Sequence, residues 1–288
     1  MNVGAVLVIA LSIASTLAAG LASDVTELRR ALATRVTWTT LAGNLVVVPM
    51  IAWLVMPALV SKPDIVGLLL VAAAPGGGIG PLLALLGRGD ASLAGALFLV
   101  LSVAGTVVAL AVTLVLDART ADMLRAAAFV AASALAPLAI GLVINRLAPR
   151  LARTAQPWAS RLGALLLVAT VLWFSIKNGR NLSAHVVGAA GVLAFISAIV
   201  GWLAPRVVGA RPNRAVTVTI VEISLVRNVA LTLVVVTGLG ATDAIMSVLT
   251  YALVMLVGGG VLAVLARRGD DLLTGGSLRR PPADSLTV

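Results

Sequence analysis

Two long apolar stretches of this chain are interrupted at matching places in its two halves. Asp64–Leu86 is interrupted by Pro75-Gly76-Gly77-Gly78-Ile79-Gly80-Pro81, and Ala215–Leu239 by Glu222-Ile223-Ser224-Leu225-Val226-Arg227-Asn228. Each stretch is followed at once by another long apolar segment. Hydrocarbon cannot satisfy the N–H and C=O groups of unwound backbone, so such breaks persist only where protein, ions or substrate do so. Paired breaks of this kind are the best sequence indication of the binding site of a secondary transporter.

The composition requires a lipid bilayer. Hydrophobic residues make up 60% of the chain and charged residues 11%, whereas about a quarter of a soluble domain is charged. Several stretches have the length that a hydrocarbon core of about 30 Å requires. They are the nine segments 3–22, 35–60, 64–87, 91–116, 123–146, 158–177, 185–205, 214–239 and 241–266. The sequence therefore predicts an all-α integral membrane protein with nine transmembrane helices.

The positive charges predict how these helices are oriented. Of the 21 Lys and Arg residues, Arg227 lies inside a predicted span, and the others divide into fifteen on one side and five on the other. The smaller group is Lys62, Arg119, Arg125, Lys177 and Arg180. Because cytoplasmic loops carry the excess of Lys and Arg, we expect the N-terminus outside and the C-terminus in the cytoplasm. The chain is thus predicted to be a multi-pass protein of the cell inner (plasma) membrane.

The two ends of the chain carry further predictions. No Lys or Arg precedes Arg29, whereas a signal peptide has its positive charge at the front, so residues 1–22 are predicted to be a retained helix. Residues 267–288 contain Gly275-Gly276 and Pro281-Pro282, and this composition is typical of a disordered tail.

Several classes of protein are disfavoured. The chain has no cysteine, so it has neither disulfides nor thiolate chemistry. Its basic residues are separated by apolar segments, and one Tyr and four Phe offer little to stack on bases, so no nucleic-acid partner is expected. The sequence has no Ser-His-Asp arrangement, metal-ligand cluster or nucleotide motif, so we expect no enzyme and no cofactor except, where the site allows it, a sodium ion.

The placement of the two breaks indicates an internal repeat. The last five predicted spans form a unit in which the broken helix 214–239 is fourth and 241–266 is fifth. The first four spans match the last four members of such a unit, with 64–87 and 91–116 in the same places. An odd offset between the units places them in opposite orientations. This is the inverted repeat of many transporters.

Glu222 is the most informative single residue. It is one of two glutamates in the chain and lies about eight residues into a predicted span. A charge at that depth costs at least a few kcal/mol unless it is paired or hydrated. One interpretation is a structural ion pair with Arg227. The other is a functional carboxylate that binds a cation or carries a proton.

Three more polar residues within spans have two interpretations each. Arg227 could hold Glu222, or it could receive an anionic substrate with its planar fork of donors. Asn228 could contact substrate or cap the second half-helix. Asn44, five residues before Pro49, could form an interhelical hydrogen bond worth about 1 kcal/mol or contribute a ligand to the Glu222 site.

The first break offers backbone groups alone. Half-helix ends that meet there direct partial charges inward, which suits an ion or an anion. The glycine run lacks the Lys-Ser/Thr ending of a phosphate loop. The predicted substrate-binding residues are therefore Arg227 and Asn228 together with Pro75, Gly76, Gly77, Gly78, Gly80 and Pro81.

These motifs resemble those of the bile acid:sodium symporter family. The resemblance covers Met1 to about Arg268 and rests on four patterns. They are Pro75-Gly76-Gly77, the turn Leu86-Gly87-Arg88-Gly89-Asp90, Glu222 before Arg227-Asn228, and Asn44 before Pro49. It implies a core domain of residues 35–116 and 185–266, built around two broken helices that cross. It also implies a smaller panel domain of residues 1–22 and 123–177, with substrate bound between the two domains and rocking for alternating access.

The chain departs from the family pattern at the ion sites. The family's first sodium site uses a Ser-Asn pair where this chain has Gly80-Pro81, and hydroxyl groups where it has Ala94 and Phe98, which implies that this site is lost. The second site keeps Glu222 and Asn44. Its neighbouring ion-binding positions are Ile223, Leu225 and Val226, and either Val226 or Arg227 takes the place of a family glutamine. An arginine in this site would itself replace a cation.

The expected function is secondary active transport of a small organic anion, of the bile-acid or carboxylate type, because family substrates are typically organic anions. Coupling to one sodium ion, to protons through Glu222, or to nothing all remain open at this point. The alternative is a transport-inactive membrane protein of the same fold that binds a ligand and acts as a sensor or regulator.

Overall fold

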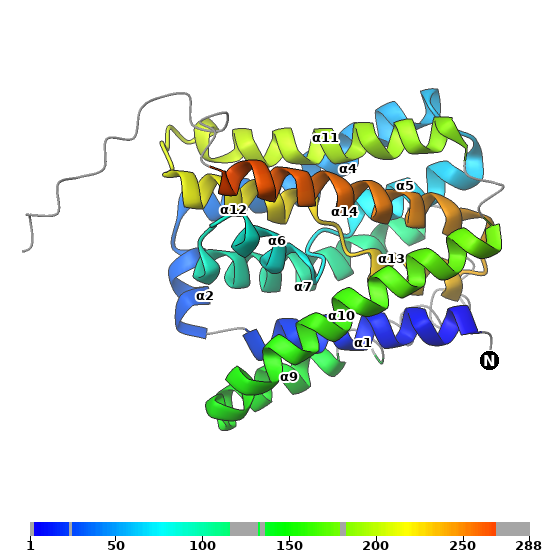
Figure 1. The fold of residues 1–288 in the computed structure, drawn as a ribbon. Coiled ribbons are helices and arrows are strands. Elements are labelled where there is room, and N and C mark those ends of the chain that lie inside the picture. The colour runs from blue at the N-terminus through cyan, green and yellow to red at the C-terminus, as the bar shows by residue number, and fades with distance from the viewer. Residues whose placement is uncertain (1–2, 23–24, 116–131, 133–135, 179–182, 269–288) are drawn as a thin grey trace, which may run out of the picture.

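The computed structural model describes residues 3–22, 25–115, 132, 136–178 and 183–268. These residues form a bundle of helices (Figure 1). The helices are α1 (Val3–Ala22), α2 (Val25–Leu32), α3 (Arg35–Ala42), α4 (Val48–Val55), α5 (Lys62–Ala73), α6 (Gly80–Leu86), α7 (Ala91–Val115), α9 (Ala136–Leu147), α10 (Pro149–Asn178), α11 (Ala184–Val207), α12 (Arg214–Leu225), α13 (Val229–Gly238) and α14 (Ile245–Arg267). Three further helices are a single turn long, namely η1 (Gly43–Val47), η2 (Met56–Ala58) and η5 (Thr242–Ala244).

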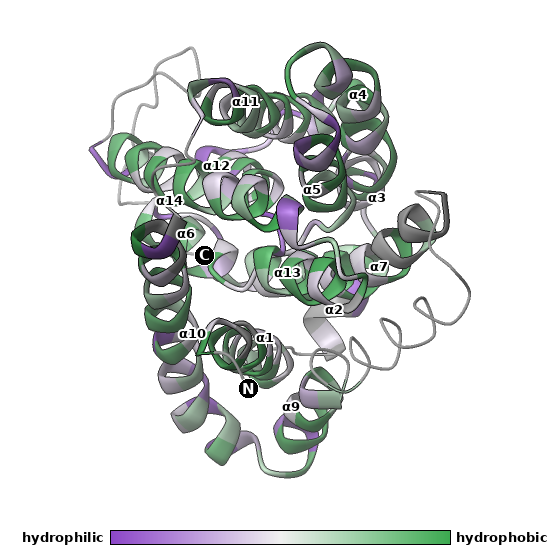
Figure 2. Cartoon of the chain, turned by 90° about the vertical axis from the view of Figure 1, so that its right-hand side faces the viewer, coloured by the Kyte–Doolittle hydropathy of each residue, from purple (hydrophilic) through white to green (hydrophobic). Residues whose placement is uncertain are grey.

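The chain is an all-α membrane protein. Within the described ranges, five helical segments are long and apolar enough to cross a bilayer. They are Arg35–Ala58, Ala91–Val108, Pro149–Trp173, Ala184–Val207 and Thr242–Arg267. Many large apolar side chains are exposed on the outside of the bundle, and Ile176 is 82% exposed. Figure 2 shows that hydrophobic residues, coloured green, predominate in most of the helices. Such a surface is expected where hydrocarbon rather than water surrounds the protein.

The helices fall into two groups (Figure 2). Helices α1, α9 and α10 pack on one another, and the remaining helices lie together beside them. Glycines allow α1 and α9 to touch along their backbones, since a Cβ at Gly20 would lie 2.2 Å from the carbonyl oxygen of Leu138. Small residues let membrane helices approach in this way. Residues 123–135 of the predicted span 123–146 lie outside the described residues except for Ala132, and so does all of the predicted tail beyond 268.

Two predicted spans differ in detail from the observed helices. The span 35–60 contains a π-helical turn, Gly43–Val47, which ends two residues before Pro49. Proline has no N–H and its ring crowds the carbonyl four residues earlier, so a wider turn accommodates it. The span 158–177 is the apolar part of a longer helix, α10, which begins at Pro149. Helix α10 can extend beyond the apolar segment because an α-helix forms its own backbone hydrogen bonds in water as well as in lipid.

Both predicted breaks exist, but both are shorter than expected. Helix α12 continues through Leu225, so Glu222 lies in its last turns and the second break is Val226–Asn228. The residues from Ile223 to Leu225 include no helix breaker, and their N–H groups stay in the helix. Pro81 belongs to the first turn of α6, where proline's missing N–H costs nothing.

Candidate functional site

The two breaks lie against each other and satisfy each other's backbone. Pro75 and Arg227 form an isolated antiparallel bridge. The N–H of Gly77 donates to the carbonyl of Val226 at 3.2 Å, and the N–H of Asn228 donates to the carbonyl of Ala74 at 2.7 Å. Unwound backbone inside a membrane needs such partners. The pairing therefore fixes the two interrupted helices to each other at their midpoints.

Glycines make this close crossing possible. Gly76 has φ +83°, a conformation that residues with a Cβ rarely adopt. Its carbonyl accepts a 2.8 Å hydrogen bond from the hydroxyl group of Ser102 on α7. A Cβ on Gly77 would lie 2.2 Å from the carbonyl oxygen of Arg227. Gly76 is therefore required by its backbone conformation, whereas Gly77 is required because there is no space for a side chain.

Arg227 extends from the second break into the core of the larger helix group. Its side chain is 1% exposed. Nη1 donates to the carbonyl oxygens of Asn44 and Ala72, both at 3.3 Å, and Nη2 donates to the hydroxyl group of Ser197 at 3.0 Å. Tyr251 of α14 also interacts with the guanidinium group. Every one of these partners is an uncharged oxygen.

Glu222 points elsewhere. It is fully buried, and neither oxygen of its carboxyl group has a hydrogen-bond partner among the described residues. It faces α14 at Gly259, where an added Cβ would lie 3.2 Å from Oε2 and 2.7 Å from a methyl group of Leu83. The structural pair of Glu222 with Arg227 is therefore absent from this structure, because the helix directs the two side chains into different surroundings.

Asn44 forms the interhelical hydrogen bond that one of its interpretations predicted. It lies in the π-helical turn η1, where its Nδ2 donates to the hydroxyl of Ser224 at 2.8 Å and to the carbonyl of Thr40 at 2.9 Å. Ser224 is two residues after Glu222, so their side chains point about 200° apart around α12. The structure thus brings Asn44 to Ser224 and Arg227, and not into hydrogen-bond contact with the Glu222 carboxyl group.

The remaining residues of the second break have structural roles. Asn228 caps α13, as one of its two interpretations predicted, because its Oδ1 accepts from the N–H of Leu231 at 3.0 Å. The side chain of Val226 packs against Gly77 and Gly80. Of the two candidates for the family's glutamine position, it is therefore Arg227 that reaches Asn44. Ile223 packs against Gly80 as well.

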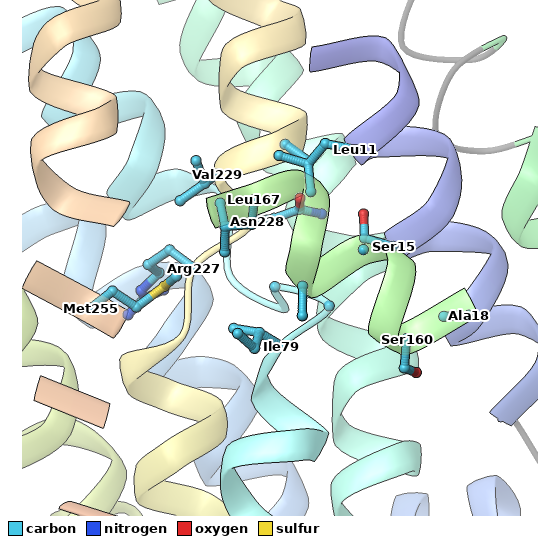
Figure 3. A pocket seen from close by; sticks show the side chains of 15 residues that line it. Leu11, Ser15, Ala18, Ile79, Ser160, Leu167, Arg227, Asn228, Val229 and Met255 are labelled. Atoms are coloured by element: carbon cyan, nitrogen blue, oxygen red, sulfur yellow. The ribbon is translucent and has the colours of Figure 1, made fainter. Parts of the chain in front are cut away.

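A small cavity lies between the crossing and the group of α1 and α10 (Figure 3). It has a volume of about 30 Å³ and is lined by residues that include Gly77, Gly78, Arg227 and Asn228. Figure 3 shows Ser15 and Ser160 on one side of it and Arg227 beside Met255 on the other. This volume suffices for little more than one water molecule or ion, so no organic anion fits there in this conformation.

A much larger cavity of about 900 Å³ lies between α1, α9 and α10 on one side and α2, α6 and α7 on the other. Three arginines line it, Arg29, Arg146 and Arg153, together with Gln156 and Pro81. Its volume lies in the range of small-molecule sites. Pro81 is thus the member of the predicted site that reaches this cavity, whereas Gly77 and Gly78 line the small one.

The positions of the family's first sodium site are apolar here. Ala94 is fully buried and Phe98 is 3% exposed, in a cluster with Ala84, Leu97 and Ile223. Gly80 and Pro81 have no side-chain oxygen to offer. A sodium ion at this place would therefore lack side-chain ligands.

Sequence reasoning missed Ser197 and Tyr251, which both interact with Arg227, and Ser224, which holds Asn44. Tyr251 carried a usable signal, since it is the only tyrosine in the chain and lies in an apolar span. Its hydroxyl group donates to the carbonyl of Leu225 at 2.8 Å. The carbonyl partners of Arg227 carried no signal, because any residue supplies a carbonyl.

Comparison with known proteins gives the family. The chain matches the sodium bile acid symporter family over residues 7–185, a range that includes Asn44, the first break and the helices α9 and α10. No curated protein matches the chain. The second break lies beyond the matched residues, but it is hydrogen-bonded to the first one. The matched family consists of transporters rather than enzymes. The match covers more than half of the chain, which therefore belongs to the sodium bile acid symporter family.

Proposed function

We propose that this protein is a secondary active transporter that moves a small organic anion across the inner membrane by alternating access. The observation that carries this proposal is the reciprocal pairing of two interrupted helices, through Gly77 with Val226 and Asn228 with Ala74. Broken helices that meet inside the membrane form the binding sites of such transporters. Family membership supports the same kind of function.

The proposed architecture has nine transmembrane helices in an inverted repeat. Residues 1–22 and 123–177 form the panel domain, and residues 35–116 and 185–266 form the core domain. The two helix groups of Figure 2 support this division. In Figure 1 the first residues of α1 and the last residues of α14 lie at opposite ends of the bundle, which supports an N-terminus outside and a C-terminus in the cytoplasm.

The larger cavity supports an anionic substrate. Its three arginines face a space between the two helix groups, and charges of one sign in a low-dielectric cavity raise the local concentration of the opposite charge. At the crossing, Gly77, Gly78, Arg227 and Asn228 line the small cavity between the same groups. Separation of the groups would open this cavity, and these residues would then receive the anion.

Glu222 is the proposed coupling residue. Both of its carboxyl oxygens are buried without a hydrogen-bond partner in the part of the chain that the structure describes, and an ionisable residue of this kind within a span is functional by default. One cation, sodium or a proton, would bind there. The lack of side-chain oxygens at Ala94 and Phe98 disfavours a second sodium ion.

A flux assay tests the proposal. The purified chain is reconstituted into liposomes, and uptake of labelled cholate and of a short monocarboxylate is followed under a sodium gradient, a proton gradient, or neither. We expect saturable uptake of at least one anion that protein-free liposomes lack. Binding of an anion in a thermal-shift assay without any uptake would instead identify a transport-inactive sensor.

A further inference from the structure

Uncharged oxygens from several helices converge on the guanidinium group of Arg227. The carbonyl of Asn44 comes from the π-helical turn η1, and the carbonyl of Ala72 comes from the last turn of α5, where that helix is interrupted. Ser197 of α11 supplies a hydroxyl group at 3.0 Å, and Tyr251 of α14 also interacts with the guanidinium group. Freed carbonyls and half-helix C-terminal ends are the groups with which transporters coordinate a monovalent cation.

The charge of Arg227 is balanced by these oxygens and not by a carboxylate. None of its hydrogen bonds among the described residues goes to an acid, and Glu222 lies against Gly259. A buried charge normally has an ion partner, because its desolvation is costly. The end of α5 contributes partial negative charge instead, since the carbonyl groups of a helix C-terminus are unsatisfied.

We propose that the guanidinium group of Arg227 is a tethered cation that permanently occupies an oxygen-lined monovalent-cation position at the helix crossing. The crossing is thereby held together, and made attractive to an anion, without a metal ion at this position. This position is separate from that of Glu222, whose carboxyl group faces α14. The consequence for transport rests on the proposed function, but the occupied position itself can be tested on protein that transports nothing.

Removing the side chain should expose the position to small cations. The full chain with Arg227→Ala is purified in detergent, and its melting temperature is measured with low-millimolar guanidinium chloride or with choline chloride at the same ionic strength. We expect the substitution to lower the melting temperature by several degrees. Guanidinium should restore part of this loss saturably, because a bound ligand stabilises by mass action. Choline, which is too large for the space left by the side chain, should restore nothing.

The parent protein and Arg161→Ala serve as controls. Arg161 is exposed and stacks on Trp158, so its removal opens no buried oxygen site. Both controls should melt at the same temperature in the two salts. If Arg227→Ala responds to guanidinium no more than to choline, the oxygens do not form a cation position and the proposal is wrong.

Two further variants decide the question if Arg227→Ala does not fold. Arg227→Lys keeps a cation on a flexible stem, and Arg227→Met keeps a similar length without charge. A tethered cation predicts that the lysine variant melts closer to the parent than the methionine variant does. A methionine variant as stable as the parent would overturn the proposal, because buried ionic groups with a merely structural role are often replaced by apolar residues at no cost. These melting experiments do not depend on flux, so failure of transport and failure of this inference are separate results.

Discussion

At the scale of single residues, the buried polar side chains at the crossing differ in their hydrogen-bond partners, and Asn44 Oδ1 and Arg227 Nε have none among the described residues. Asn228 caps a half-helix, Asn44 joins two helices through Ser224, and Arg227 binds uncharged oxygens. Glu222 has none of these solutions, since both of its oxygens lack a hydrogen-bond partner among the described residues. A buried polar group without a partner is costly, which is why we assign the coupling role to Glu222.

The first prediction concerns Glu222 and Arg227 together. Glu222→Gln should abolish cation-coupled uptake in liposomes while the melting temperature stays close to that of the parent, because the carboxyl group gives up no hydrogen bond. The double variant Glu222→Gln with Arg227→Met should also be inactive, since the two side chains do not pair. A double variant that folds and transports like the parent would show that the two residues form only a structural ion pair.

The second prediction concerns the cap of α13. Asn228→Ala should lower the free energy of unfolding by about 1–2 kcal/mol, because the N–H of Leu231 loses its partner in a buried place. Asn213 is a matched control, since its Oδ1 caps α12 in the same way at Val216 but at an exposed end. Asn213→Ala should therefore cost less, as water can replace the cap. Equal melting temperatures for the two variants would contradict this difference.

At the scale of elements, the crossing depends on how closely two stretches of backbone approach. The bridge between Pro75 and Arg227 leaves no room for a side chain at Gly77. The same principle brings α1 against α9 at Gly20. In both places the missing side chain allows the backbones to come this close, and at the crossing the hydrogen bonds of Gly77 and Asn228 then hold them together.

The third prediction tests this close approach. Gly77→Ala should cost about 3 kcal/mol or prevent folding, because the new methyl group would overlap the carbonyl of Arg227 and separate the two breaks. Gly191→Ala on α11 is the control, since a Cβ there meets nothing within 4 Å and alanine favours a helix. Melting temperatures of both variants in detergent provide the measurement. Equal stability of the two variants would argue against an essential backbone crossing.

At the scale of the whole molecule, two helix groups line a basic cavity that lies between them. The cavity between the groups has about 900 Å³, and the crossing lies beside the boundary between them. Relative movement of the groups would therefore change access to both at once. In alternating access, movement of one helix group against the other opens the binding site to one side of the membrane at a time.

The fourth prediction follows from the apolar surroundings of Ala94 and Phe98. Sodium must exchange its hydration water for protein oxygens, and this region offers no side-chain oxygen at Gly80, Pro81, Ala94 or Phe98. Uptake measured against sodium concentration should show no dependence or a Hill coefficient of about 1. A Hill coefficient near two would require a second sodium site and would contradict the prediction that the region around Ala94 and Phe98 binds no sodium ion.

The fifth prediction concerns topology. A tag placed after Val288 should be accessible from the cytoplasm and one placed before Met1 from outside, because fifteen of the 21 basic residues lie on the predicted cytoplasmic side. Accessibility to a membrane-impermeant reagent in intact and opened cells measures this. Both tags on the same side would rule out an odd number of spans.

The sequence by itself determined the properties that depend on local composition. Apolar length required a membrane, and the segments Pro75–Pro81 and Glu222–Asn228 marked where two helices are interrupted, although each interruption is shorter than its segment. Asn228 was recognisable as a cap because capping involves neighbours in the chain. The resemblance to the symporter family likewise rested on short motifs, and it agrees with the family match over residues 7–185.

Only the tertiary structure decided which way the polar side chains of the crossing point. Glu222 and Arg227 are five positions apart, yet one faces Gly259 and the other reaches Asn44, Ala72 and Ser197. The helix extends through Leu225 before it is interrupted, and this register sets the two directions. Two of the partners of Arg227 are backbone carbonyls, which every residue has. Their convergence therefore comes from packing of distant helices and leaves no trace in residue identity.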